Sequence, residues 1–111
     1  MGKVVEFRSY NLKSGTREEF HRLLLEQSLP LLGRWGVDVV AFGPSLHDRD
    51  SYYLIRAYES LADHASSQEA FYGSSDWRDG PRDAIISLID AHTSFVIEME
   101  VSTVDALRTR A

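Results

Sequence analysis

The chain has 111 residues, a formal net charge of −5 and only two lysines, Lys3 and Lys13. This balance excludes the basic surface that binding to nucleic acid or to an anionic membrane requires. The absence of cysteine excludes disulfides, thiolate catalysis and cysteine-ligated metals. The length predicts one domain with a two-layer core. Met1 leads almost directly into the first strand pattern, without a signal segment or a long apolar run, so we expect a soluble cytoplasmic protein.

The N-terminal third of the chain has the pattern of a strand, a turn and a helix. Residues 4–12 predict the first strand. Thr16, with Glu19 three positions later, has the spacing of a capping box at the start of the first helix. Pro30 lies inside the helical pattern and cannot donate a backbone hydrogen bond, so we expect the helix to kink or restart there.

Two further strands and a second helix follow. Residues 37–46 and 52–58 are rich in strand-forming residues and are joined by a polar turn at 47–50. Ser60 is placed to cap the second helix, which glycine and serine interrupt at 73–75. The pattern predicts a two-stranded hairpin that leads into a helix.

The last part of the chain predicts a short helix through Ile85 and Ile89 and a fourth strand at 93–100. The order βαββαβ indicates an α+β, ferredoxin-like fold, with an antiparallel sheet in the order 4-1-3-2 and the helices on one face. We expect a domain over residues 4–100. The tail, residues 101–111, is predicted to be a frayed end or a short helix that lies on a partner.

Because side chains alternate along a strand, the two sheet faces can be compared. One face is apolar and is predicted to pack under the helices. It carries Val5, Phe7, Val37, Val39, Tyr53, Ile55, Ala57, Phe95, Ile97 and Met99. The other face mixes charged, aromatic and aliphatic side chains and is too apolar to be left in water. We expect the same face of a second copy to cover it, which gives a dimeric barrel with a partly polar interior.

The chain resembles the NIPSNAP family over residues 4 to about 100. The resemblance lies in short motifs whose order and spacing match: EFRSY at 6–10, KSG at 13–15, LPLL at 29–32, YESLA at 58–62 and DW at 76–77. It implies the dimeric α+β barrel superfamily, which includes small cofactor-independent monooxygenases, isomerases and haem-binding relatives. It does not imply a particular reaction.

The candidate site lies on the mixed sheet face, where the strand register gathers two glutamates, two arginines and two tyrosines: Glu6, Arg8, Tyr10, Arg56, Tyr58 and Glu98. Arg8 and Arg56 would clamp a carboxylate or enolate, because guanidinium groups match planar oxyanions. Tyr10 or Tyr58 would donate a hydrogen bond. Glu6 or Glu98 would act as a base if burial raises its pKa.

The same residues have a structural interpretation. Two arginines and two glutamates sum to zero charge, and buried charges are normally paired. The cluster could therefore be an ion-pair network that only stabilises the barrel.

Two histidines and one tryptophan also have two interpretations each. His64 and His92 are each a candidate acid/base group or, as in a barrel relative, an axial haem ligand; the alternative is a structural histidine. No histidine pair has metal-ligand spacing, so we expect no metal or other cofactor. Trp77 lies between Gly73 and Gly80 and would either close over a ligand or pack in the core.

Two function hypotheses follow. In the first, the protein binds or converts a small anionic or aromatic organic molecule in the barrel, without a metal. In the second, it is a non-catalytic protein–protein module whose barrel is only the core of a homodimer. An open sheet that binds RNA is excluded by the net charge.

Overall fold

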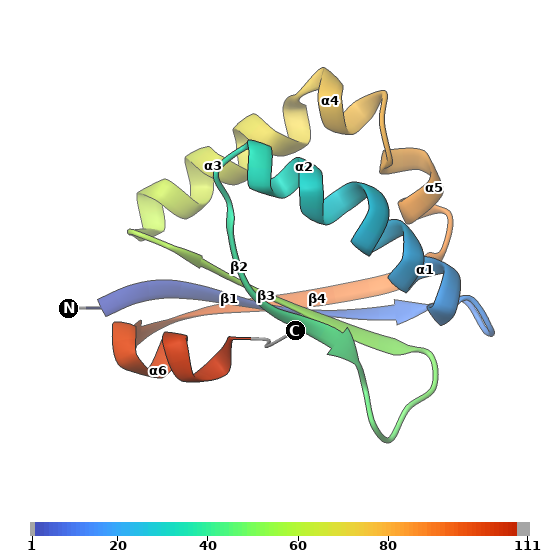
Figure 1. The fold of residues 1–111 in the computed structure, drawn as a ribbon, viewed down its shortest axis with the longest axis horizontal. Coiled ribbons are helices and arrows are strands. Elements are labelled where there is room, and N and C mark those ends of the chain that lie inside the picture. The colour runs from blue at the N-terminus through green and yellow to red at the C-terminus, as the bar shows by residue number, and fades with distance from the viewer. Residues whose placement is uncertain (1, 109–111) are drawn as a thin grey trace.

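Four antiparallel strands form one sheet in the order β2-β3-β1-β4 (Figure 1). The computed structural model describes residues 2–108. Its elements are β1 (Gly2–Leu12), α1 (Arg17–Leu23), a π-helical turn (Leu24–Ser28), α2 (Leu29–Arg34), β2 (Asp38–Pro44), β3 (Ser51–Tyr58), α3 (Leu61–Gly73), α4 (Ser75–Arg78), α5 (Arg82–Ile86), β4 (Ile89–Glu100) and α6 (Val101–Leu107). The predicted ferredoxin-like order, with β1 and β3 in the centre, is confirmed. None of the helices within residues 2–108 is both long and apolar enough to cross a membrane.

The prediction of which sheet face the helices cover is wrong. Helices α1 to α5 lie over the face that carries Glu6, Arg8 and Tyr10, and α6 is the one helix of residues 2–108 on the other face (Figure 1). Phe20 of α1 packs against Tyr10 and Tyr52, with both ring centroids 5.1 Å away. The large tyrosine and leucine side chains of this face supply the buried area that the helices need, and its charged groups pair with one another.

The apolar face is only partly covered. Val104 of α6 is 1% exposed and packs against Val5 and Ile55 in a second core cluster. The α6 helix therefore lies on its own sheet, whereas the sequence predicted a frayed end or a helix on a partner. Phe95 and Ile97 on the same face remain 58% and 44% exposed.

A bulge in β2 changes which of its side chains face the helices. The register against β3 shifts between Val39 and Ala41, so one extra residue of β2 lies in this interval. Val39 and Phe42 pack against the core under the helices, whereas Val40 and Ala41 belong to the cluster under α6. The predicted alternation, which places Val39 beside Val5, is therefore wrong, because strict period-two reasoning does not include bulges.

The first helical segment restarts at Pro30, as predicted. Pro30 lies in the first turn of α2, directly after the π-helical turn, where its missing N–H is tolerated. The predicted capping box is absent: the Thr16 hydroxyl donates to the carbonyl of Lys13 at 2.7 Å and caps nothing in α1. Gly36, with φ +73°, ends the segment, and the N–H of Val37 reaches back to the carbonyl of Leu32 at 3.0 Å.

In the second half of the chain, the cap of the second helix is confirmed, and the predicted end of the short helix and start of the last strand are wrong. The Ser60 hydroxyl caps α3 by accepting the N–H of Asp63 at 3.0 Å. The predicted short helix ends at Ile86, and β4 begins at Ile89 rather than at 93. Residues 89–92 are strand because they pair with the end of β1, where Tyr10 lies opposite His92.

We predict opposite effects from two Gly→Ala changes at the end of the first helical segment. Gly33 is helical and Gly36 has a positive φ, and a Cβ at either position has no neighbour within 4 Å. Gly36→Ala should lower the free energy of unfolding by about 1 kcal/mol, because a Cβ disfavours the left-handed region. Gly33→Ala should raise it by roughly 0.5 kcal/mol, because alanine has the higher helix propensity. Urea unfolding measures both, and equal effects would contradict the assigned backbone.

Candidate functional site

The centre of the candidate site is a buried carboxylate that binds two guanidinium groups. Glu6 and Arg56 face each other on β1 and β3 and are 2% and 1% exposed. Arg56 donates from Nε and Nη2 to Oε1 of Glu6 at 3.0 and 2.6 Å. Arg8 donates from Nη2 to the other oxygen, Oε2, at 2.9 Å. Each carboxylate oxygen therefore fixes one arginine.

Helix α3 completes this cluster with two residues that the sequence analysis missed. The hydroxyl oxygen of Tyr72 accepts from Nη1 of Arg56 at 2.9 Å and from Nη1 of Arg8 at 3.2 Å. Gln68 donates to Oε1 of Glu6 at 2.8 Å. Their spacing of four places them with His64 on one side of α3. This spacing in the sequence groups the three residues but does not show that their side of α3 meets the sheet.

The arginines decide the protonation state of Glu6. Burial alone would raise the pKa of the Glu6 carboxyl, but the charges and hydrogen bonds of Arg56 and Arg8 outweigh burial and hold the pKa below its usual value. The raised pKa that the sequence analysis required for a base is therefore not found at Glu6. Glu6 is an ionised hydrogen-bond acceptor at neutral pH.

The second predicted acid of the cluster, Glu98, lies outside it. Val96 lies opposite Glu6, whereas Glu98 lies opposite Val4, is exposed and lies beside Gly2. Two guanidinium charges thus face one carboxylate, which leaves one excess guanidinium charge. The zero sum expected for the ion-pair interpretation does not hold.

A pocket of ≈ 340 Å³ lies against this cluster, between α3, α4, α5 and the β1–β4 side of the sheet. Arg8 and Tyr72 form part of its wall, and most of the remaining wall is apolar or aromatic. Its lining residues are Arg8, Tyr10, Gln68, Tyr72, Trp77, Arg82, Ile85, Ile86, Ile89 and His92. The pocket combines a positive polar end with apolar walls, which is the usual composition of a small-molecule site.

Two predicted aromatic residues line this pocket. Tyr10 is 7% exposed, and burial raises the pKa of its phenol, so it is a hydrogen-bond donor at neutral pH. Trp77 is 8% exposed and packs against Phe71 and Tyr72, with ring centroids 5.5 and 5.4 Å apart. Trp77 is therefore a wall of the pocket in this structure, and its predicted contact with a ligand stays a prediction.

Tyr58 and His64 lie on the other side of the cluster, away from this pocket. The Tyr58 hydroxyl accepts from Nε2 of Gln68 at 3.4 Å, and its ring contacts that of His64 at 4.9 Å. Nε2 of His64 lies 3.8 Å from Oε2 of Glu6 and is buried without a hydrogen bond. Tyr58 and His64 therefore pack beside Glu6 and Gln68, and neither lines the pocket. Within residues 2–108, no group of three or more His, Asp or Glu side chains is placed to hold a metal ion.

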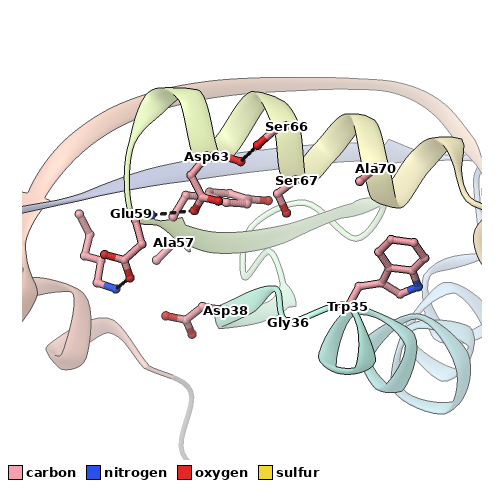
Figure 2. A pocket seen from close by; sticks show the side chains of 11 residues that line it. Trp35, Gly36, Asp38, Ala57, Glu59, Asp63, Ser66, Ser67 and Ala70 are labelled. Carbon is pink, nitrogen blue, oxygen red and sulfur yellow. Dashed lines mark hydrogen bonds and ion pairs between the residues drawn. The ribbon is translucent and has the colours of Figure 1, made fainter.

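A larger pocket of ≈ 510 Å³ lies between α3 and the start of β2 (Figure 2). Its three carboxylates already have partners: Glu59 pairs with Lys3, Asp38 binds Arg108, and Asp63 accepts the backbone N–H of Glu59. Lys3 and Arg108 balance only two of these three carboxylates, so the pocket carries an excess negative charge and does not favour an anionic ligand. We therefore place the candidate site at Arg8.

The comparisons with solved structures show the fold. The chain is similar to a NIPSNAP family protein from Agrobacterium tumefaciens, with a TM-score of 0.80 and 16% identity over 89% of this chain and 87% of that one. It is also similar to an uncharacterised NIPSNAP domain protein from Burkholderia xenovorans, with a TM-score of 0.77 and 17% identity over 85% and 91%. The expected likeness to NIPSNAP structures is confirmed.

A third similar structure has a different description. It is a provisionally assigned antibiotic biosynthesis monooxygenase from Bordetella bronchiseptica, with a TM-score of 0.68 and 22% identity over 90% of this chain and 97% of that one. No protein-family model matches the chain, and no curated protein sequence matches it significantly. The fold is thus shared by proteins with different descriptions, so the function must be argued from the site.

The lowered pKa of Glu6 predicts a specific loss of stability in acid. Below the unfolded-state pKa of about 4.3, the unfolded chain takes up a proton at Glu6 that the native protein takes up only at lower pH. The free energy of unfolding should therefore fall as the pH drops through this range. Glu6→Gln should remove this part of the pH dependence, whereas Glu26→Gln, at an exposed position of the π-helical turn, should keep it. Unfolding curves between pH 3 and 6 measure it, and an unchanged slope in Glu6→Gln would contradict the prediction.

Proposed function

We propose that the pocket beside Arg8 binds a small organic molecule with an anionic end and an apolar or aromatic body. The observation that carries this proposal is the excess positive charge of the Glu6–Arg8–Arg56 cluster at the end of an otherwise mostly apolar pocket. A buried excess charge is costly unless it is compensated, and an anion in the pocket would compensate it.

Arg8 is the arginine that would contact the ligand. It lines the pocket, its side chain is 13% exposed, and its Nε is buried without a hydrogen-bond partner. Arg56 lies deeper, and Glu6 and Tyr72 engage three of its five N–H groups. Arg56 therefore fixes the geometry of Glu6 and Tyr72, and Arg8 presents the charge.

The opposite wall would hold the body of the ligand. Trp77, Ile85 and Ile89 provide aromatic and aliphatic surface, and Tyr10 provides a protonated hydroxyl. We assign no reaction, because an ionised Glu6 held by two arginines is a weak base. Catalysis by Tyr10, Glu98, Glu6 or His64 stays a prediction.

We predict that the wild-type protein binds phenylacetate and that Arg8→Gln weakens this binding. Loss of a hydrogen bond to a charged group should lower the affinity by roughly tenfold or more. The matched control is Arg22→Gln, because Arg22 is an exposed arginine of α1 that pairs with Glu19 of α1 and with Glu26 of the π-helical turn, away from the pocket. Isothermal titration calorimetry measures the affinities. Equal affinities of Arg8→Gln and the wild type would refute the assignment of the site.

A homodimer is our second proposal, and it now rests on the opposite sheet face. Phe7 and Phe95 stack there with ring centroids 5.0 Å apart, beside exposed Tyr53 and Ile97. These four side chains are uncharged, so two copies that meet through them about a two-fold axis would not suffer like-charge repulsion. The alternative function rests on the same face. It is a non-catalytic protein–protein module, in which this face serves only as the core of the homodimer.

We predict that the wild-type protein is a dimer at micromolar concentration and that Phe95→Asp is a folded monomer. Phe95 is 58% exposed, so the aspartate should not disturb the core of the protomer. The control is Leu46→Asp, at a fully exposed position in the turn between β2 and β3. Light scattering coupled to gel filtration measures the mass. A monomeric wild type would refute the homodimer.

A further inference from the structure

Tyr72 has a hydroxyl hydrogen for which residues 2–108 provide no acceptor. Its oxygen accepts from both Arg8 and Arg56, at 3.2 and 2.9 Å, so both of its acceptor positions are occupied. No hydrogen bond of the described residues has Tyr72 as the donor. Tyr72 lines the pocket beside Arg8, so its hydroxyl can donate into the space where a ligand would lie.

The charge available to a ligand is one unit. Glu6 neutralises one of the two guanidinium groups, because its two oxygens bind one arginine each. The other cation that lines the pocket, Arg82, is exposed and pairs with Asp83 at 2.9 Å. A ligand with one negative charge therefore brings the inner end of the pocket to neutrality, and a ligand with two leaves an excess negative charge.

We propose that this site selects monoanions, with the anionic group held between the hydroxyl of Tyr72 and the guanidinium of Arg8. The inference rests on the proposed function and adds the charge class of the ligand and a specificity-determining residue. A dianion would be bound less tightly, because its second charge would be desolvated without a partner. Glu6 sets this preference as the internal counter-ion.

Three probes with a phenyl body test the proposal: phenylacetate, phenyl sulfate and phenyl phosphate. The first two carry one negative charge, and the third is mostly dianionic at pH 8, well above a second phosphate pKa of about 6. Calorimetry should give similar affinities for the two monoanions and an affinity about tenfold or more lower for phenyl phosphate. Equal or tighter binding of phenyl phosphate would overturn the charge selection while leaving the proposed function intact. Failure of all three probes to bind would refute the proposed function itself.

Two variants test the roles of the residues. Tyr72→Phe keeps the packed ring and removes the donor, so it should weaken phenylacetate binding roughly tenfold. Tyr53→Phe, on the opposite sheet face, is the matched control and should bind like the wild type. Glu6→Gln should shift the preference toward phenyl phosphate, because it raises the excess charge to two. If Glu6→Gln does not fold, Tyr72→Phe alone decides, and unchanged binding by Tyr72→Phe would overturn the role of Tyr72.

Discussion

The carboxylate of Glu6 is the constraint on which the site depends. It is buried under a helical layer, where a charge without partners would be strongly destabilising. Arg56 and Arg8 satisfy it from the same sheet face, one at each oxygen. Because their own charges exceed that of Glu6, the cluster that stabilises the interior also produces a positive end in the adjacent pocket.

Helix α3 links this cluster to the rest of the fold. Its side chains at 64, 68 and 72 meet the sheet at intervals of four residues, so one side of the helix contacts Glu6, the arginines and Tyr58. The cap at Ser60 determines where this helix starts. The helical segment is interrupted after α3 and again after α4. These interruptions place Trp77 of α4 and Ile85 of α5 in the pocket wall that also contains Arg8.

The two faces of the sheet have different tasks. The helix-covered face contains the polar cluster and the pocket within a single protomer, so a ligand site there does not need a second copy. The other face has α6 on one part and exposed aromatic side chains on the rest, which is where a partner would be accommodated. The similar solved structures share this fold but have different descriptions, so the fold alone does not give the function. Ligand binding is therefore tested on the helix-covered face, and dimer formation on the other face.

Alternation groups Glu6, Arg8 and Tyr10 along β1, because side chains on a strand repeat every two residues, and it groups Arg56 and Tyr58 along β3 in the same way. Matching the more apolar side of each strand then predicts that the two groups share a sheet face, and the register confirms it. The element order likewise determined the sheet topology. Only the tertiary structure decided which face the helices cover, because both faces carry enough apolar area and period two does not distinguish them. It also decided that Glu98 lies outside the cluster and that Gln68 and Tyr72 enter it. Those contacts depend on the strand offset and on the placement of α3, and neither is encoded by local spacing.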